Sequence, residues 1–533
     1  MDLHEKTVTA DSGGAVSGGA VSSGAVSSGK TQAATAAAVS ARANPMSVRQ
    51  KIASGLDRIA FICFCLIAIF APHSIEWAFL AFQAAFLVWF LKLLVAARRF
   101  QPQPLLAPAL LFLALATIAT SLSYAPTLSW PRLRWFALLF LAVLVTQNLS
   151  SLKQIRILIF LLLASAMFSV ARTGWQYGHG IGTELVTVSP ETNLFQRGLR
   201  SGDIVQAING HATRTPAQWS EALQATRADK TLTLRVARNA PLEIYPSMQV
   251  TNADLQQWLN QPGVVVKRGR PPRAQGHFYH YIPYAGMLLQ LGLLVFGLLL
   301  SGWQEHKAMR WMLAAAFLGL AAALVATVTR TYMATLLLGC VFLLWLAHKK
   351  IRTLAWVALA LGFIVATLWI QKERKMGWVA LGDAGSEYRW LMWKDAPRLI
   401  AQHPVFGVGP DSVLMYGEQW GLAAYKKFPL RSHFHSTFIE LAVDCGLPCL
   451  AAWVWLMTAY LLFLARGWKR AQNWPWFPRG AFLGIFGGAI AFMMSSVIHY
   501  AQGDAEVMIL IWFFAGIAIV LTRILGSDPP AVA

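Results

Sequence analysis

Apolar runs separated by short polar links dominate the chain. From about Arg58 to Arg523 these runs recur at lengths near 20 residues, the length that a helix needs to cross a bilayer core of about 30 Å. The pattern therefore predicts an all-α polytopic membrane protein of about 12 transmembrane helices. The expected spans are approximately 57–71, 75–96, 105–123, 132–148, 153–171, 281–301, 309–326, 331–347, 353–370, 437–465, 480–499 and 505–523.

Basic residues in the links set the expected orientation. Arg49, Lys51 and Arg58 favour a cytoplasmic N-terminus, and every short link that then lies inside carries Lys or Arg. This distribution satisfies the positive-inside rule. We therefore expect both termini in the cytoplasm and two long polar segments, 172–280 and 371–436, on the outer side.

Composition excludes an ordinary soluble protein. Of the 533 residues, 56% are hydrophobic and 13% are charged, whereas soluble domains carry roughly 25% charged residues. A net charge of +21 would suit a nucleic-acid partner, but much of it lies in the links, where it sets topology. We expect no nucleic-acid partner. The first 50 residues repeat Gly-Ala-Val-Ser, which predicts a disordered tail.

These features predict six parts in order along the chain. They are a disordered cytoplasmic tail (1–50), helices 1–5 (57–171), an outer insertion (172–280), helices 6–9 (281–370), an outer loop (371–436) and helices 10–12 (437–525).

The outer insertion has the pattern of a small α+β domain. Residues 198–210 read Gly-Leu-Arg-Ser-Gly-Asp-Ile-Val-Gln-Ala-Ile-Asn-Gly, in which Asn209-Gly210 predicts a hairpin turn. Over about 180–240 the chain resembles a bacterial PDZ domain. The resemblance implies a groove that captures a peptide partner by adding a strand. The alternative is a spacer domain whose groove is filled.

Residues suited to chemistry gather in the outer parts. Arg330 lies between two apolar runs with almost no loop, and a cation at that depth is a candidate functional residue. The alternative is an interfacial arginine that reaches the lipid headgroups. The second outer segment adds Arg389, Trp393 and His435. A histidine just before a membrane helix is well placed as a general base.

At these positions the chain resembles the O-antigen ligase and polymerase superfamily. Arg330 matches an outer-face arginine in a Ser/Thr-Arg context, and Arg389 with Trp393 matches an Arg-x-x-x-Trp stretch. The family's glycine-rich turn and its His-Ser-x-aromatic stretch are matched by Pro404, Gly407, Gly409, Pro410, His435, Ser436, Phe438, Ile439, Asp444 and Gly446.

The resemblance implies an enzyme of the bacterial inner membrane that acts on its periplasmic face. Arg330 and Arg389 would hold the diphosphate of a polyprenyl-diphosphate-linked glycan donor, since guanidinium groups pair with phosphate oxygens. His435 would deprotonate an acceptor hydroxyl, and Glu440 or Asp444 would fix its tautomer.

Further substrate-site candidates are Trp393, His433 and His499. The resemblance implies no cofactor, because the diphosphate donor already carries the activation energy. A metal site built on His433-x-His435 with His403, His499 and Glu387 is the alternative, but these residues lack tight ligand spacing, so no metal is expected.

Several functions fit these residues. The leading hypothesis is a ligase that transfers polysaccharide to lipid A-core, with membrane lipids around it. An O-antigen or exopolysaccharide polymerase and a protein O-oligosaccharyltransferase would use other hydroxyl acceptors. A transporter or scaffold that carries a PDZ-like domain is the non-enzymatic alternative. Against it, the arginines and His435 lie on one face, whereas a transport site lies near the midplane.

Overall fold

The computed structural model describes residues 48–96, 100–101, 103–227, 230–239, 242–261, 266–271, 273–303, 307–347, 361, 364, 384–428 and 431–526. The predicted tail, apart from residues 48–50, lies outside the described residues, and so does the predicted span 353–370, apart from residues 361 and 364.

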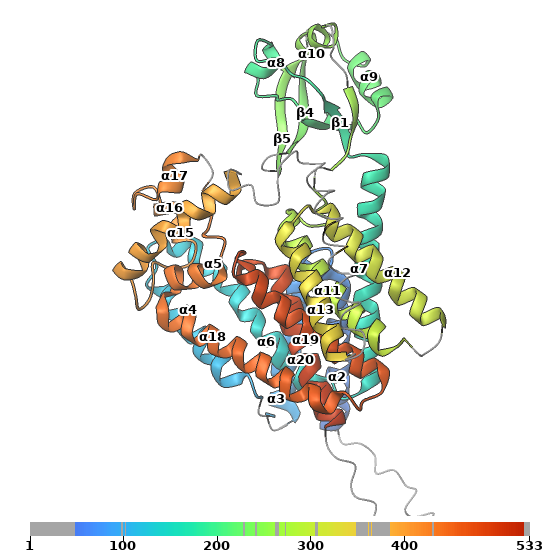
Figure 1. Ribbon diagram of the computed structural model, residues 1–533, viewed down its shortest axis with the longest axis vertical. Helices are drawn as coiled ribbons and strands as arrows, with labels where there is room; N and C mark the ends of the chain where they lie inside the picture. Colours follow the sequence, from blue (N-terminus) through green and yellow to red (C-terminus); the bar gives the residue numbers. More distant parts are fainter. Residues whose placement is uncertain are drawn as a thin grey trace, which may run out of the picture. The chain divides into compact units, whose positions relative to one another are not determined.

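Long apolar helices make up most of the described chain, which confirms the prediction of an all-α polytopic membrane protein (Figure 1). Ten of them are long and apolar enough to cross a membrane among the described residues. The helices outside the insertion are α2 (Val48–Phe70), α3 (Ile75–Ala96), α4 (Leu106–Ser121), α5 (Pro126–Phe136), α6 (Phe140–Asn148), α7 (Leu152–His179), α11 (Tyr281–Ser301), α12 (Lys307–Ala326), α13 (Arg330–Ala347), α15 (Ala384–Gln402), α16 (Ser412–Tyr416), α17 (Ala423–Lys427), α18 (Thr437–Ala471), α19 (Trp476–Ser496) and α20 (Ala505–Leu525).

Several boundaries differ from the sequence-based expectation, among them the start of α2 at Val48 and the end of α7 at His179. The predicted span 132–148 is the second part of a longer segment, in which α5 continues through a 3-10 turn, η1 (Ala137–Leu139), into α6. Pro131 and Arg132 lower the hydropathy of its first turns, so the sequence pattern did not predict them as part of the span. The predicted span 105–123 is a helix of 16 residues, shorter than a full crossing.

Helices α11 and α19 pack face to face at the centre of the bundle, and α20 and α13 lie beside them (Figure 1). Glycines make the close approach of the first pair. A Cβ atom on Gly297 would lie 2.4 Å from the backbone nitrogen of Gly484, and one on Gly484 would lie 2.5 Å from the Cα of Leu294. Small residues at such contacts allow two membrane helices to gain dispersion energy without a hydrophobic driving force.

Between α7 and α11 lies a domain with its own sheet and core. Its strands and helices are β1 (Gly182–Leu185), α8 (Asn193–Gln196), β2 (Ile204–Ile208), β3 (His211–Ala212), α9 (Pro216–Gln224), β4 (Thr231–Asn239), β5 (Leu242–Thr251), α10 (Asn252–Leu259) and β6 (Val266–Gly269). The sheet order is β5-β4-β2-β1-β6, with β3 beside β2. The inward positions of these strands form a core with Trp219 and Trp258.

The two ends of this domain are joined. β1 and β6 pair antiparallel from Gly182 opposite Gly269 to Leu185 opposite Val266, and the N–H of Ile181 donates to the carbonyl oxygen of Gly269 at 2.9 Å. The outer edge of β1 is therefore occupied by the chain's own β6.

Helix α18 is broken at Gly446, whose φ is 82° and ψ 169°. Pro448 has no N–H to donate to the carbonyl of Asp444, and the turn at 404–409 supplies the missing bonds. The N–H groups of Val408 and Gly409 donate to the carbonyls of Val443 and Asp444 at 2.9 and 2.8 Å. In return, the N–H of Leu447 donates to the carbonyl of Pro404 at 2.8 Å.

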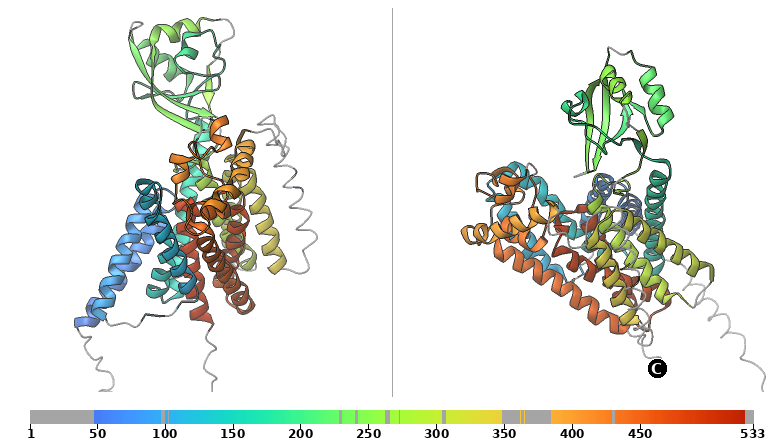
Figure 2. Two further views of the ribbon diagram at one scale, coloured as in Figure 1. Left: turned by 90° about the vertical axis from the view of Figure 1, so that its left-hand side faces the viewer. Right: turned by 45° about the horizontal axis from the view of Figure 1, so that its top comes forward.

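The short helices α15, α16 and α17 gather at the N-terminal end of α18 (Figures 1 and 2). They share a small apolar core with the start of α18, in which Met392, Leu399, Phe434 and Val443 are buried. The 404–409 turn and this core fix the start of α18 and the loop before it.

Replacing Gly446 with Ala should destabilise the fold by about 3 kcal/mol, since a Cβ atom would lie 2.1 Å from the carbonyl oxygen of Val405 and a left-handed residue with a side chain is strained. Thermal unfolding of the purified protein measures the change. Gly174→Ala in α7 is the control, because a Cβ there meets no atom within 4 Å. Equal stabilities of the two variants would contradict this account of the break.

Candidate functional site

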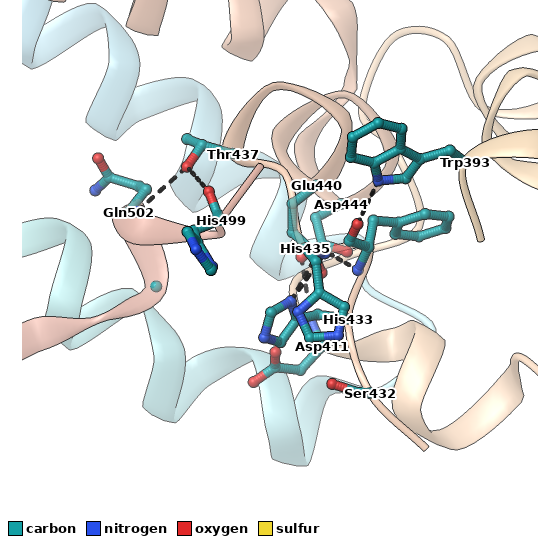
Figure 3. Close-up of polar contacts among 12 residues, drawn as sticks. Trp393, Asp411, Ser432, His433, His435, Thr437, Glu440, Asp444, His499 and Gln502 are labelled. Atoms are coloured by element: carbon teal, nitrogen blue, oxygen red, sulfur yellow. Dashed lines mark hydrogen bonds and ion pairs between the residues drawn. The ribbon is translucent and has the colours of Figure 1, made fainter. Parts of the chain in front are cut away.

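The loop before α18 is held in place by hydrogen bonds to its backbone (Figure 3). The indole N–H of Trp393 donates to the carbonyl of Phe434 at 2.7 Å, and the Tyr388 hydroxyl lies 3.0 Å from both the N–H and the carbonyl of Ser432. From the other side, Thr437 donates its N–H and its hydroxyl to the carbonyl of His499 at 3.1 and 3.0 Å. Residues from three separate parts of the chain therefore position His435.

Three residues at this end of the bundle adopt left-handed backbone conformations although they are not glycines. They are Val328 (φ 53°), Asp411 (φ 61°) and His435 (φ 55°). Each such residue costs about 1–2 kcal/mol. His435 is the candidate base, Val328 lies two residues before Arg330, and Asp411 is an ion-pair partner in the same region. Strain of this kind persists where the surrounding structure fixes it, and it often marks a functional site.

The two loop histidines lie against each other, with ring centroids 4.2 Å apart. The Nδ1 atom of His433 accepts from the N–H of His435 at 3.1 Å. Glu440 lies beside His433, with Oε2 3.9 Å from Nδ1, and it accepts from the N–H of Phe434 at 2.6 Å. Side chains in the first turn of a helix point back toward its N-terminus. The carboxylate of Glu440 therefore reaches the N–H of Phe434 and accepts its hydrogen bond.

This geometry differs from the expected role of Glu440 and Asp444 as partners of the His435 ring. The Nδ1 atom of His435 has no hydrogen-bond partner among the described residues. Asp444 instead accepts from the N–H of Asp411, at 3.4 Å. Glu440 therefore holds the loop through Phe434, and Asp444 holds the neighbouring turn through Asp411.

Three histidines of this region, His433, His435 and His499, are neutral at neutral pH. Burial, followed by the positive charge of Arg389, lowers the pKa of His435 to about 3. The same two causes lower the pKa of His499 to about 3, and burial and His435 lower the pKa of His433 well below its usual value. The charge of Arg389 acts on all three, so Arg389 lies near the histidine cluster.

Arg330 reaches the same end of the bundle as the first residue of α13. Two residues later, the ring of Tyr332 stacks on that of His499, with centroids 4.7 Å apart and planes within 4°. This stack joins the start of α13 to the loop before α20. Arg389 thus acts on the candidate histidines by its charge. Arg330 is linked to them by Tyr332, which stacks on His499.

A third arginine was not expected from the sequence. Arg132 of α5 forms a bidentate pair with Asp411, with Nε–Oδ2 and Nη2–Oδ1 distances of 2.8 and 2.9 Å. Its Nη1 donates to the carbonyl of Gly503 at 3.4 Å. Arg132 therefore ties α5 to the 404–411 turn and to the link before α20. An arginine at the edge of an apolar run was the available signal.

Several buried polar atoms around this network lack a protein partner among the described residues. They are His435 Nδ1, His499 Nε2, Asp444 Oδ1, Tyr332 Oη, Tyr500 Oη and Ser496 Oγ. Buried polar groups in folded proteins are nearly always paired. A set of them in one region indicates a place where substrate or water supplies the partners.

Metal-binding geometry is not found here: in the part of the chain that the structure describes, no three His, Cys, Asp or Glu residues are placed to hold an ion. The network offers guanidinium groups and neutral imidazoles. That combination suits an anionic, phosphate-bearing ligand and an acceptor hydroxyl.

Residues 314–454 match the family model described as O-antigen ligase. Over these residues the chain is similar to that family. The match contains Arg330, Arg389, Trp393, His433 and His435, together with the two carboxylates of α18, and it ends before His499. No curated protein matches the chain.

The family match and the apolar helices together indicate a multi-pass protein of the bacterial inner membrane. Family members are membrane enzymes of the glycosyl-transferring kind, which act on a glycan donor and a lipid acceptor among membrane lipids.

Replacing Arg132 with Gln should destabilise the protein by about 3 kcal/mol, because it leaves the carboxylate of Asp411, which is only 13% exposed, without its counter-charge. Asp411→Asn should cost a similar amount. The double variant should be less destabilised than the sum of the two, since the partners act together. Denaturant unfolding of all four proteins measures the coupling, and strict additivity would contradict the pairing.

Proposed function

We propose that the chain is a ligase that transfers a polyprenyl-diphosphate-linked polysaccharide to lipid A-core on the periplasmic face of the inner membrane. The observation that supports this most is a neutral His435 with an open Nδ1, held beside Arg389 within the family match. A neutral imidazole can accept a proton, and a guanidinium can bind a diphosphate.

The reaction follows from these groups. The hydroxyl oxygen of the acceptor sugar attacks the anomeric carbon of the donor, and the bond from that carbon to the diphosphate oxygen breaks. The hydroxyl proton passes to His435, and polyprenyl diphosphate leaves with the bonding electron pair. Arg389 and Arg330 stabilise the charge that grows on the leaving diphosphate.

The remaining residues of the proposed site have supporting roles. Trp393 donates its indole N–H to the carbonyl of Phe434 and so positions the loop. Only its ring is then available to contact a substrate. His433 and Glu440 hold the backbone of the loop. His499 and Asp444 each keep an unpartnered atom toward this region, which suits contacts to the acceptor sugar.

Two other acceptors fit the same chemistry. A polymerase would extend another lipid-linked repeat, and a protein O-oligosaccharyltransferase would use a Ser or Thr hydroxyl. A peptide-binding groove in the insertion would favour the latter, although the edge of β1 is not open to an added strand because β6 pairs along it.

Deletion of the gene should remove the ladder of capped lipid A-core on a lipopolysaccharide gel. The variants His435→Ala, Arg389→Ala and Arg330→Ala should each lower transfer by at least about 100-fold, since they remove charge-stabilising or proton-accepting groups. Arg398→Ala is the control: Arg398 lies on α15, is exposed and donates to the carbonyl of Trp420.

Other outcomes of this experiment point elsewhere. Survival of a single-repeat band with loss of long chains would make the protein a polymerase. An unchanged ladder would end the lipopolysaccharide assignment and direct attention to glycoproteins.

The pH dependence of transfer should differ between free and donor-bound enzyme. In the free enzyme the pKa of His435 is lowered to about 3, so the base stays neutral and kcat/KM should show no acid limb from it above about pH 4. The donor's negative charge favours the imidazolium and raises that pKa. The acid limb of kcat should therefore lie at higher pH than that of kcat/KM. Coincident limbs near pH 6.5 would contradict the proposed setting of His435.

A further inference from the structure

A cavity lies at the other end of α18 from the candidate site. It has a volume of about 720 Å³ and lies between α18, α20, the end of α6 and the residues before α4. Its lining includes three arginines, Arg466, Arg470 and Arg523, and none of the described lining residues is acidic. After the break at Gly446, α18 runs for about 20 residues to Arg466, roughly 30 Å at the rise of a helix.

The cavity is polarised along α18. Residues that line it recur three and four positions apart, which places them on one face of the helix. Trp455, Thr458, Leu462 and Phe463 come first and form a mainly apolar wall, and Arg466 and Arg470 follow at the end. From Trp455 to Arg470 this face extends for about 22 Å, close to half the thickness of a bilayer including its headgroups.

The cationic end of the cavity is pre-arranged. The guanidinium of Arg523 donates to the side-chain oxygen of Gln101 at 2.5 Å and to the carbonyls of Thr146 and Leu149 at 2.8 and 2.5 Å. These bonds use three of its five N–H groups. Arg466 and Arg470 are exposed, and their side chains have no hydrogen bond or ion pair with any described residue. Among the described residues that line the cavity, three therefore carry a positive charge and none carries a negative one.

We propose that this cavity binds an anionic phospholipid, with the phosphate between Arg466, Arg470 and Arg523 and an acyl chain along Trp455 and Leu462. An apolar wall that continues into a cluster of guanidinium groups matches the two ends of such a lipid. A basic residue that only sets membrane topology does not have to line a cavity. Lys469 is an example, since it lies next to Arg470 in the sequence but outside the lining. The site lies in the leaflet opposite the candidate glycan site.

The test uses the purified full chain in detergent and native mass spectrometry with dioleoyl phosphatidylglycerol, dioleoyl phosphatidylcholine or soluble glycerol phosphate. We expect preferential retention of phosphatidylglycerol. The variant Arg466→Gln/Arg470→Gln should bind it about 30-fold more weakly, as two basic residues near an anionic headgroup contribute that factor together. Binding of phosphatidylcholine should not change.

Matched variants separate the cavity from general charge. Lys307→Gln/Lys469→Gln removes two charges at the same end of the bundle, outside the lining, and should change phosphatidylglycerol binding by less than about twofold. Thr458→Trp fills the apolar wall, keeps every arginine, and should also weaken binding.

Three results would overturn the proposal. Equal retention of the two lipids by the wild-type protein would show no anionic site. An equal loss in the lysine variant, or full binding by Thr458→Trp, would show attraction without the cavity. Competition by glycerol phosphate at the concentrations at which the lipid binds would assign the arginines to a soluble anion.

Discussion

One missing hydrogen bond shapes the outer end of this protein. Pro448 leaves the carbonyl of Asp444 without its helical donor in the membrane region, where an unpaired carbonyl costs several kcal/mol. The N–H of Gly409 in the 404–409 turn donates to this carbonyl instead. The glycines of the turn allow the close contact, since a Cβ on Gly407 would lie 2.4 Å from the carbonyl oxygen of Val443. The turn and the helix thus satisfy each other's backbone groups.

The candidate site depends on that junction. The turn continues into Asp411, which pairs with Arg132 and donates its N–H to Asp444. Arg132 in turn touches the link that leads from His499 to α20. Elements far apart in the chain therefore meet through backbone groups and one ion pair, and the loop that carries His435 lies between them. The strained backbone of His435 is held by this assembly.

Hydropathy was sufficient to predict the helical membrane fold, because span length and charge are local properties of the chain. Motif resemblance led to the family and to Arg389 and His435 as candidates, which the structure places in one region. Arg132 with Asp411 could not be predicted, since the partners lie 279 positions apart. The place of Glu440 beside His433 could not be predicted either, because it depends on how the loop turns back at a left-handed residue.

The insertion between α7 and α11 illustrates how a long polar segment can be carried by a membrane bundle. Its first and last strands lie next to each other and close it at its base. To the two flanking helices, the whole domain is therefore equivalent to a very short connection, whatever its length. Loop-closure entropy grows only slowly with length in any case, and here the closure is met by the domain's own sheet. Such a segment is a module: evolution could add, exchange or remove it while the helices on either side keep their positions.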